Sequence, residues 1–142
     1  MKQLAVLFCL ACLLLFTNGC EKDKSALPGS MEGVWELRQA KGMATINYPP
    51  GNGNTIKFSG DHYEMSANGQ VVKSGTFTII PDATVSASTC IEINNGWYSN
   101  RIVYDNDMTG SKVFIEVSLN KLNFISGCFA LDAGAVTEYV RQ

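Results

Sequence analysis

Side chains able to do chemistry are sparse in this chain of 142 residues, and one group with a ligand-like spacing lies between Asp105 and Glu116. Asp105 and Asp107 alternate with neutral residues, Gly110 follows and Glu116 comes late, a spacing close to that of a calcium-binding loop. Thr109, however, stands where Asp or Asn is usual, and both flanks have the pattern of strands instead of helices. We therefore expect a turn built from Asp, Asn and Gly, and no metal site.

No arrangement typical of a hydrolase is visible. The single histidine, His62, lies in a predicted tight turn beside Asp61, and the chain has no G-x-S-x-G motif. Ser118-Leu119-Asn120-Lys121 matches S-x-x-K, but that motif needs a helix and this stretch bridges two predicted strands. Glu92 and Glu116 fall at alternating strand positions, where exposure to solvent is the simplest expectation. The sequence predicts a protein that is not an enzyme and that carries no cofactor.

The five cysteines separate into groups by position. Two lie in the apolar N-terminal stretch, and Cys20 ends it, which leaves Cys90 and Cys128. An even pair of cysteines favours a disulfide if the chain is exported to an oxidising compartment, which its N-terminal residues predict below. That bridge would stabilise the fold by about 3–4 kcal/mol on the chain-entropy model. Two buried free thiols are the alternative, since two distant cysteines and His62 offer too few ligands for zinc.

The N-terminal residues 1–24 predict where the protein works. Lys2 supplies a positive charge, Leu4 to Phe16 is almost wholly apolar, and Gly19-Cys20 precedes a charged stretch, which indicates a secretory signal too short to span a membrane. Gly19-Cys20 resembles the lipobox of bacterial lipoproteins, with Thr17 where that family prefers Leu. The resemblance implies a palmitate-type anchor on Cys20 in a Gram-negative outer membrane, facing the periplasm or the cell surface. A plain signal peptide, with Cys20 as an ordinary thiol, is the alternative.

Length and charge limit the classes of partner. Residues 1–19 are expected to be the signal peptide, residues 20–30 the acylated cysteine and a flexible tether, and residues 31–142 one folded domain. The net charge is -2 and no run of Lys or Arg occurs, so nucleic acid is not an expected partner. The expected membrane contact is therefore the lipid anchor.

Strand signals recur about every ten residues, and no stretch has a convincing helical period. Turn signals such as Asn68-Gly69 separate them, and Gly75 is a candidate bulge or bend. Residues 41–54, with two prolines, are expected to be a long loop, and Phe129-Ala130-Leu131 an apolar loop segment. Sequential hairpins favour an all-β, antiparallel up-and-down barrel of about eight to nine strands over a sandwich. The predicted strands cover residues 33–38, 55–58, 63–66, 71–80, 84–93, 97–104, 112–118, 122–127 and 135–141.

Two residues at opposite ends of the domain carry a family resemblance. Gly33-Val34-Trp35 is similar to the G-x-W motif of the lipocalin and wider calycin group, and Arg141 stands where that group has an Arg near the end of its last strand. The resemblance implies a lipocalin-like barrel in which Trp35 plugs one end and Arg141 packs across its ring. Tyr104-Asp105 is not the T-D-Y-like motif of classical lipocalins.

Large apolar side chains are the remaining candidates for a site. They either line a pocket in the barrel or pack its core, and a carrier or sensor of a small, mainly apolar ligand is the first hypothesis. The second is a filled barrel whose loops, residues 41–54 and 129–134, contact an envelope complex or a host enzyme. The candidate pocket residues are Phe58, Tyr63, Met65, Phe77, Trp97, Phe114 and Phe124.

Overall fold

The computed structural model describes residues 31–94 and 96–142. The expected signal peptide, Cys20 and the tether therefore lie outside the described residues. Within the described ranges, no helix combines the length and the apolar character that crossing a bilayer requires.

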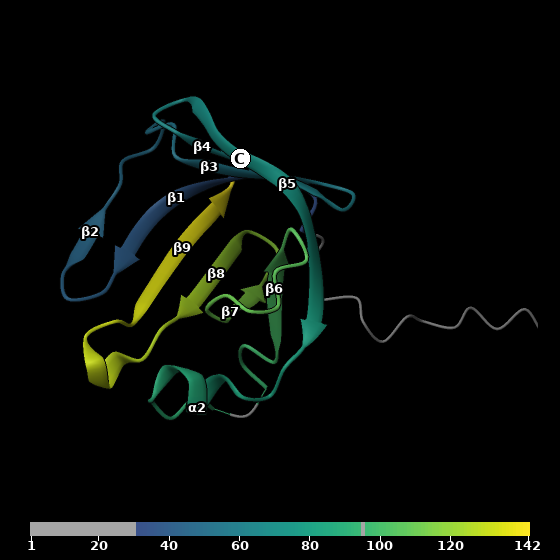
Figure 1. Cartoon of the computed structure of the whole chain (residues 1–142). Coiled ribbons are helices and arrows are strands. Elements are labelled where there is room, and N and C mark those ends of the chain that lie inside the picture. The colour runs from purple at the N-terminus through teal and green to yellow at the C-terminus, as the bar shows by residue number, and fades with distance from the viewer. Residues whose placement is uncertain (1–30, 95) are drawn as a thin grey trace, which may run out of the picture.

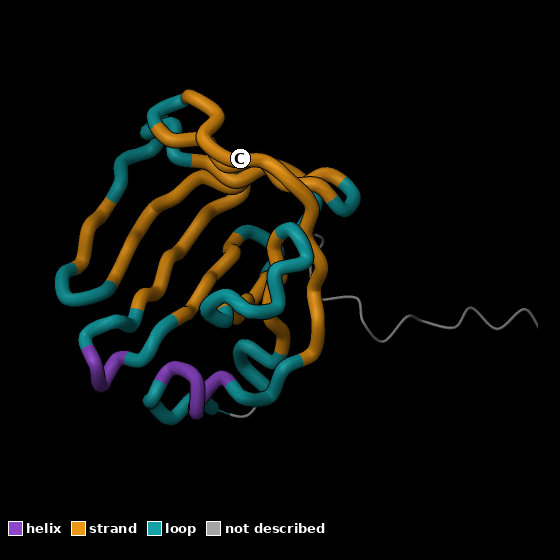
Figure 2. Tube along the Cα trace, viewed as in Figure 1, coloured by secondary structure: helices purple, strands orange, loops and turns teal. Residues whose placement is uncertain are grey.

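The described chain is an antiparallel β-barrel. Nine strands follow the order β2-β1-β3-β4-β5-β6-β7-β8-β9 in the described part, and β1 also pairs with β9. That pairing closes eight strands into a barrel, with β2 as an extra strand on β1 (Figures 1 and 2). The prediction of an all-β antiparallel barrel is confirmed. The strands are β1 (Gly33–Lys41), β2 (Thr45–Asn47), β3 (Thr55–Ser59), β4 (His62–Ala67), β5 (Gln70–Pro81), β6 (Asn100–Tyr104), β7 (Val113–Val117), β8 (Lys121–Ser126) and β9 (Ala135–Arg141).

The main core fills the barrel because alternate residues of a strand face the same side. Phe58 and Phe77 meet edge to face with their centroids 4.8 Å apart, and Phe124 meets Tyr139 at 5.6 Å. This geometry is favourable for aromatic pairs. The fully or nearly buried members of the cluster are Met31, Trp35, Ile56, Phe58, Tyr63, Ile102, Ile115, Val117, Leu122 and Phe124.

Strand β5 belongs to two parts of the barrel. Its N-terminal part pairs with β4, from Gln70↔Ala67 to Thr76↔His62, and its last five residues pair with β6. The register shifts between Met65 and Ser66, so an extra β5 residue bulges there. The β6–β7 ladder is short and ends at Ile102↔Val113. The two strands therefore separate beyond that pair, and residues 105–112 connect them.

Two local predictions are wrong. Residues 84–93, predicted as a strand, instead contain the short helix α2 (Val85–Thr89), and residues 41–54 include the end of β1 and strand β2. The remaining loop is tied to the barrel, since Asn52 Nδ2 donates a hydrogen bond to the carbonyl of Leu37 at 2.9 Å. Residues 129–131 lie outside a strand, as predicted, and form the 3-10 helix η1 (Phe129–Leu131).

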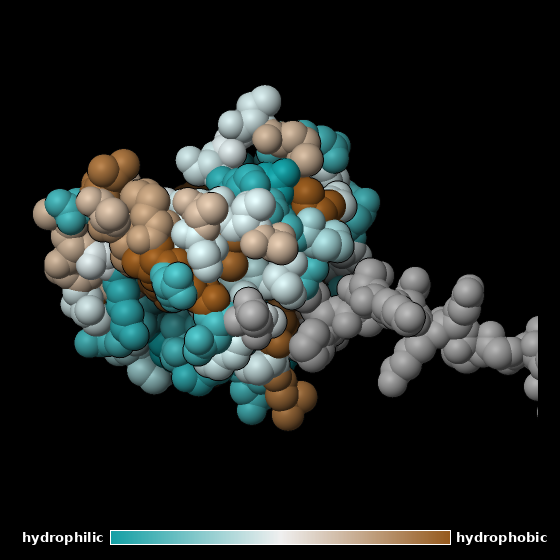
Figure 3. All heavy atoms as spheres, turned by 90° about the horizontal axis from the view of Figure 1, so that it is seen from below, coloured by the Kyte–Doolittle hydropathy of each residue, from teal (hydrophilic) through white to brown (hydrophobic). Residues whose placement is uncertain are grey.

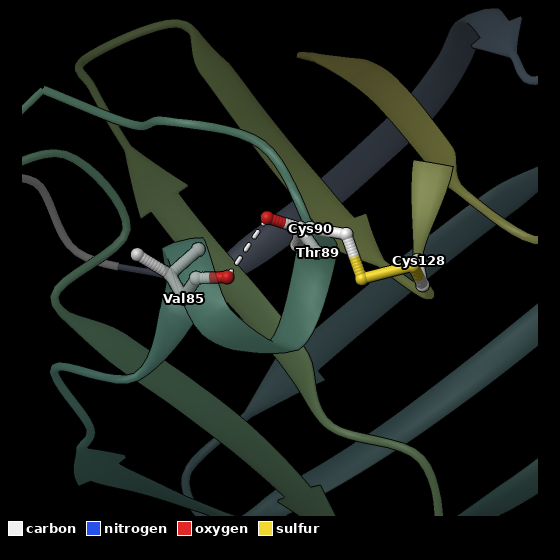
Figure 4. The surroundings of a disulfide bond; sticks show 4 residues. All are labelled: Val85, Thr89, Cys90 and Cys128. Atoms are coloured by element: carbon white, nitrogen blue, oxygen red, sulfur yellow. Dashed lines mark hydrogen bonds between the residues drawn. A yellow bond between two sulfur atoms is a disulfide. The ribbon is translucent and has the colours of Figure 1, made fainter. Parts of the chain in front are cut away.

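A second, smaller core lies on the opposite face of β7 and β8. Val85 of α2 packs with Phe114 and Ile125, and Phe129 and Val136 contact the same cluster. The predicted disulfide between Cys90 and Cys128 is confirmed, and it links the end of α2 to the segment before η1 (Figure 4). Thr89 Oγ1 donates a 2.8 Å hydrogen bond to the carbonyl of Val85, which satisfies the buried hydroxyl. The residues around α2 thus cover apolar side chains outside the barrel.

Candidate functional site

Trp35 and Arg141 meet where the first and last strands pair. Trp35 is fully buried, and its Nε1 donates a 2.8 Å hydrogen bond to the carbonyl of Met31. The Arg141 guanidinium carbon lies 4.1 Å from the Trp35 ring centroid, a cation–π geometry. Arg141 Nε donates to the carbonyl of Leu119 at 3.1 Å, and Nη1 donates to the carbonyl of Glu32. This end of the barrel is therefore held together by packing and backbone contacts.

The candidate pocket residues do not share one wall. Phe58, Tyr63 and Phe124 are buried in the main core, and Met65 and Phe77 are half-buried against it. The expectation that Phe114 and Trp97 face the interior is wrong. Phe114 belongs to the second core, because it alternates along β7 with the inward-facing Val113 and Ile115, and Trp97 is 58% exposed beside α2. Much of the interior is occupied by packed side chains.

A polar cluster adjoins the half-buried face of the core. Tyr63 Oη donates a hydrogen bond to Asp105 Oδ2 at 2.9 Å, and the Thr76 backbone N–H donates to Asp105 Oδ1 at 3.0 Å. Lys73 Nζ lies 3.5 Å from Asp105 Oδ2 and 5.7 Å from the Tyr104 ring centroid. The hydrogen bond from Tyr63 is the largest cause that lowers the pKa of Asp105. Asp105 is therefore held as an anion beside the Lys73 cation.

Gly75 makes room for the Asp105 carboxylate, and it is not the bulged residue of β5. A Cβ at residue 75 would lie 1.9 Å from Asp105 Oδ1, so only glycine leaves room for the carboxylate. The bulge lies earlier in β5, opposite Met65 and Ser66. The predicted special role of Gly75 thus has a different cause, the close approach of a side chain from the β6–β7 connection.

A cleft of about 310 Å³ opens where the β6–β7 ladder ends. Its apolar lining includes Ile102, Tyr104 and Val113, which also contact the main core. Its polar lining comes from β5, β6 and the 105–112 connection. The remaining lining residues are Lys73, Arg101, Val103, Asp105, Asp107, Gly110 and Ser111. The volume is at the small end of ligand pockets, and the mixture of an apolar wall with a few charged groups is typical of them.

Arg101 and Lys112 share one carboxylate beside this cleft. Asp82 Oδ2 lies 3.2 Å from Arg101 Nε and 2.9 Å from Lys112 Nζ, and Asp82 Oδ1 accepts two hydrogen bonds from Thr84. Burial raises the pKa of Asp82, but the hydrogen bonds from Thr84 and Lys112 outweigh it and hold that pKa at about 2. Arg101 Nη2 lies 3.8 Å from the sulfur of Met108.

The carboxylates of the calcium-like segment are engaged by separate groups in the described structure. Asp107 Oδ1 accepts hydrogen bonds from the Thr109 N–H and hydroxyl at 2.9 and 2.6 Å, and from the Gly110 N–H at 3.2 Å. Asp105 is engaged by Tyr63 and Thr76, and Glu116 lies on β7. The segment is thus a turn held by its own side chains, as is usual for Asp-rich connections.

An apolar surface lies on the β1–β2 hairpin and on η1, which adjoin. Met43 is 87% exposed and Ile46 53% exposed at the β1–β2 hairpin, and Leu131 is 76% exposed in η1. Met43 shares a small cleft with Phe129, so the hairpin and η1 lie side by side. Figure 3, which views the molecule from below, shows hydrophobic side chains gathered on one side of this face. We call Met43, Ile46 and Leu131 the apolar rim.

Comparison of the chain with protein-family models, with curated proteins and with solved structures finds no match. The fold and the cleft therefore define the class, a closed antiparallel eight-stranded β-barrel that is compatible with a calycin-like fold and with a ligand-binding module.

Proposed function

We propose that this chain is a small-ligand-binding module without catalytic activity, and that the ligand binds in the cleft between β6 and β7. The observation that carries the proposal is the cleft itself, which joins apolar side chains of the core to the charged groups Lys73 and Arg101. The proposal places the ligand at the side of the barrel, because Phe58, Tyr63 and Phe124 already occupy the interior.

The test is native mass spectrometry of the mature protein purified gently from its own host. We expect a reproducible extra mass that is lost on unfolding. Val113→Trp adds bulk to the lining of the cleft and should abolish the extra mass. Val136→Trp is the control, because Val136 belongs to the second core outside the barrel, and it should leave the extra mass in place. A bare protein under all gentle conditions would count against the proposal.

The proposal includes anchoring at the outer membrane through acylated Cys20. Two or more lipid chains suffice for stable anchoring without a spanning helix. Labelled palmitate should enter the wild-type protein and not the Cys20→Ser variant, and that variant should move from the membrane to the soluble fraction. Equal labelling of both proteins would contradict the assignment of Cys20.

The apolar rim supports a second candidate function, contact with an envelope or host protein. Exposed large apolar residues gathered on neighbouring elements are typical of protein interaction sites. Met43→Glu combined with Leu131→Glu should abolish crosslinking to such a partner. Leu119→Glu is the matched control, because Leu119 is also exposed and lies in the β7–β8 turn. Unchanged crosslinking in the double variant would exclude this surface.

A further inference from the structure

Arg101 is a largely buried cation whose terminal nitrogens have no strong acceptor among the described residues. Its side chain is 11% exposed. Nε faces Asp82, and the one acceptor that the described residues offer the terminal nitrogens is the sulfur of Met108, at 3.8 Å from Nη2. A thioether is a weak acceptor, whereas a guanidinium has five N–H donors. The Asp82 carboxylate is already shared with Thr84 and Lys112, so part of the hydrogen-bonding capacity of Arg101 is unused.

The other charged groups of the cleft are committed elsewhere. Asp105 accepts from Tyr63 and Thr76 and lies beside Lys73, and Asp107 accepts from its own turn. The two carboxylates balance the charges of Lys73 and Arg101 in the lining. Of the two cations in the lining, Arg101 is the less exposed, at 11% against 54% for Lys73, and it keeps donor capacity. A guanidinium also pairs best with a planar carboxylate.

Resting on the proposed function, we infer that the ligand of the cleft carries a carboxylate that binds the terminal nitrogens of Arg101. The short apolar part of the ligand packs on Ile102, Tyr104 and Val113. Met108, an exposed residue of the connecting loop, occupies the position of that carboxylate and moves aside when the ligand binds. A flexible thioether is well suited to such a role because it adapts its shape at little cost.

The test uses the full chain carrying Cys20→Ser, with its methionine methyl groups labelled with carbon-13. The probes are hexanoate, hexan-1-ol and hexylamine, which share one chain length and differ in charge. Hexanoate should shift the Met108 methyl signal in a saturable way and leave that of Met43, on the apolar rim, unchanged. Hexan-1-ol should bind about tenfold more weakly, a loss of about 1.4 kcal/mol, because it offers the guanidinium no charged acceptor. Hexylamine should not bind.

Variants separate the carboxylate contact from general binding. Arg101→Gln should reduce hexanoate affinity about tenfold, to that of hexan-1-ol. Lys121→Gln, which removes a cation paired with Glu138 outside the cleft, should leave hexanoate affinity unchanged. Met108→Ala keeps the Arg101–Asp82 pair and should tighten hexanoate binding, measured by titration calorimetry beside the wild type because the variant lacks the Met108 signal. The inference is thus tested even where Arg101→Gln fails to fold.

Each failure has a distinct signature. Equal affinity for hexanoate and hexan-1-ol would overturn the carboxylate inference and leave the proposed ligand-binding function standing. Binding of hexanoate that Met108→Ala does not strengthen would show that Met108 does not cover the site. If no probe shifts the Met108 signal at any concentration, the inference fails, and native mass spectrometry decides the broader function separately.

Discussion

At the scale of single residues, Asp82 has the clearest consequence for stability. Its pKa of about 2 lies below the ordinary value of 3.8, because Thr84 and Lys112 stabilise the ionised form. A depressed pKa contributes stability that is fully present above the unfolded pKa and is lost as the pH falls through the folded pKa. We expect the free energy of unfolding to fall by about 2 kcal/mol between about pH 5 and about pH 2 because of this residue alone.

The Asp82→Asn variant isolates that effect. It should be less stable than the wild type near neutral pH, and the difference should shrink toward zero as the pH falls to about 2. Urea unfolding followed by tryptophan fluorescence at each pH measures both proteins. Asp61→Asn is the control, because Asp61 is a largely exposed residue in the β3–β4 turn. A difference between Asp82→Asn and wild type that does not change with pH would contradict the prediction.

At the scale of elements, the disulfide holds the α2 segment on the outer face of the sheet. Cys90 and Cys128 close a loop with a sequence separation of 38 residues. Replacing both cysteines with alanine should lower the free energy of unfolding by about 3–4 kcal/mol on the chain-entropy model. Amide hydrogen exchange should rise most around α2, where Val85 covers Phe114 and Ile125. If hydrogen exchange rises first in β3 and β4, the disulfide supports the barrel itself and not the α2 segment.

The free edge of β5 is a second feature at this scale. Residues 70–75 pair with β4, and β6 pairs with β5 only from Phe77 onward. Val71 and Val72 are exposed on this edge, and a bulge and Lys73 interrupt it. Bulges and lysines are common protections against edge-to-edge association. Lys73→Val should therefore lower the concentration at which the protein aggregates in light scattering, whereas Lys57→Val, on the inner strand β3, should not.

Local sequence patterns predicted the strands correctly where one face of the strand packs on the core. They gave the wrong element where contacts with residues distant in sequence determine the structure. Ile56 and Phe58 alternate with exposed Lys57, so the local pattern suffices for β3. Residues 84–93 carry β-branched side chains that favour a strand, but Val85 and Thr89 lie four apart in α2 and are both buried, and Val85 packs on Phe114 and Ile125. A helix of five residues is too short to show its period in the sequence.

At the scale of the whole molecule, the cleft could not be predicted from local patterns at all. Lys73, Arg101 and Val113 meet only because β5 changes partners and the β6–β7 ladder ends early. By contrast, Trp35 and Arg141 were predicted as a pair from a family resemblance. In the structure the guanidinium carbon of Arg141 lies 4.1 Å from the Trp35 ring centroid. A contact between residues far apart in sequence can be predicted when both belong to a known motif. The charged groups of the cleft belong to no such motif.

Closure of the barrel makes the two ends of the domain depend on each other. Trp35 pairs with Arg141 across the β1–β9 ladder, and the Gln142 N–H donates to the carbonyl of Val34 at 2.9 Å. Because β1 and β9 are the first and last strands of the barrel, every closing contact is non-local and costs chain entropy to form. Arg141→Met should keep part of the packing on Trp35 but lose the cation–π contact and both carbonyl hydrogen bonds. We expect a loss of about 2 kcal/mol in the free energy of unfolding.

The same contact should set how cooperatively the barrel unfolds. In the wild type, tryptophan fluorescence and far-ultraviolet circular dichroism should report one coincident urea transition, as expected for a single small domain. Deleting residues 139–142 removes the part of β9 that pairs with Trp35, Glu36 and Leu37, and it exposes an edge of β1. That truncated chain should show a broad transition or none, with the β1 end unfolding first. A sharp, coincident transition in the truncated chain would show that the remaining ladders hold the barrel without its closure.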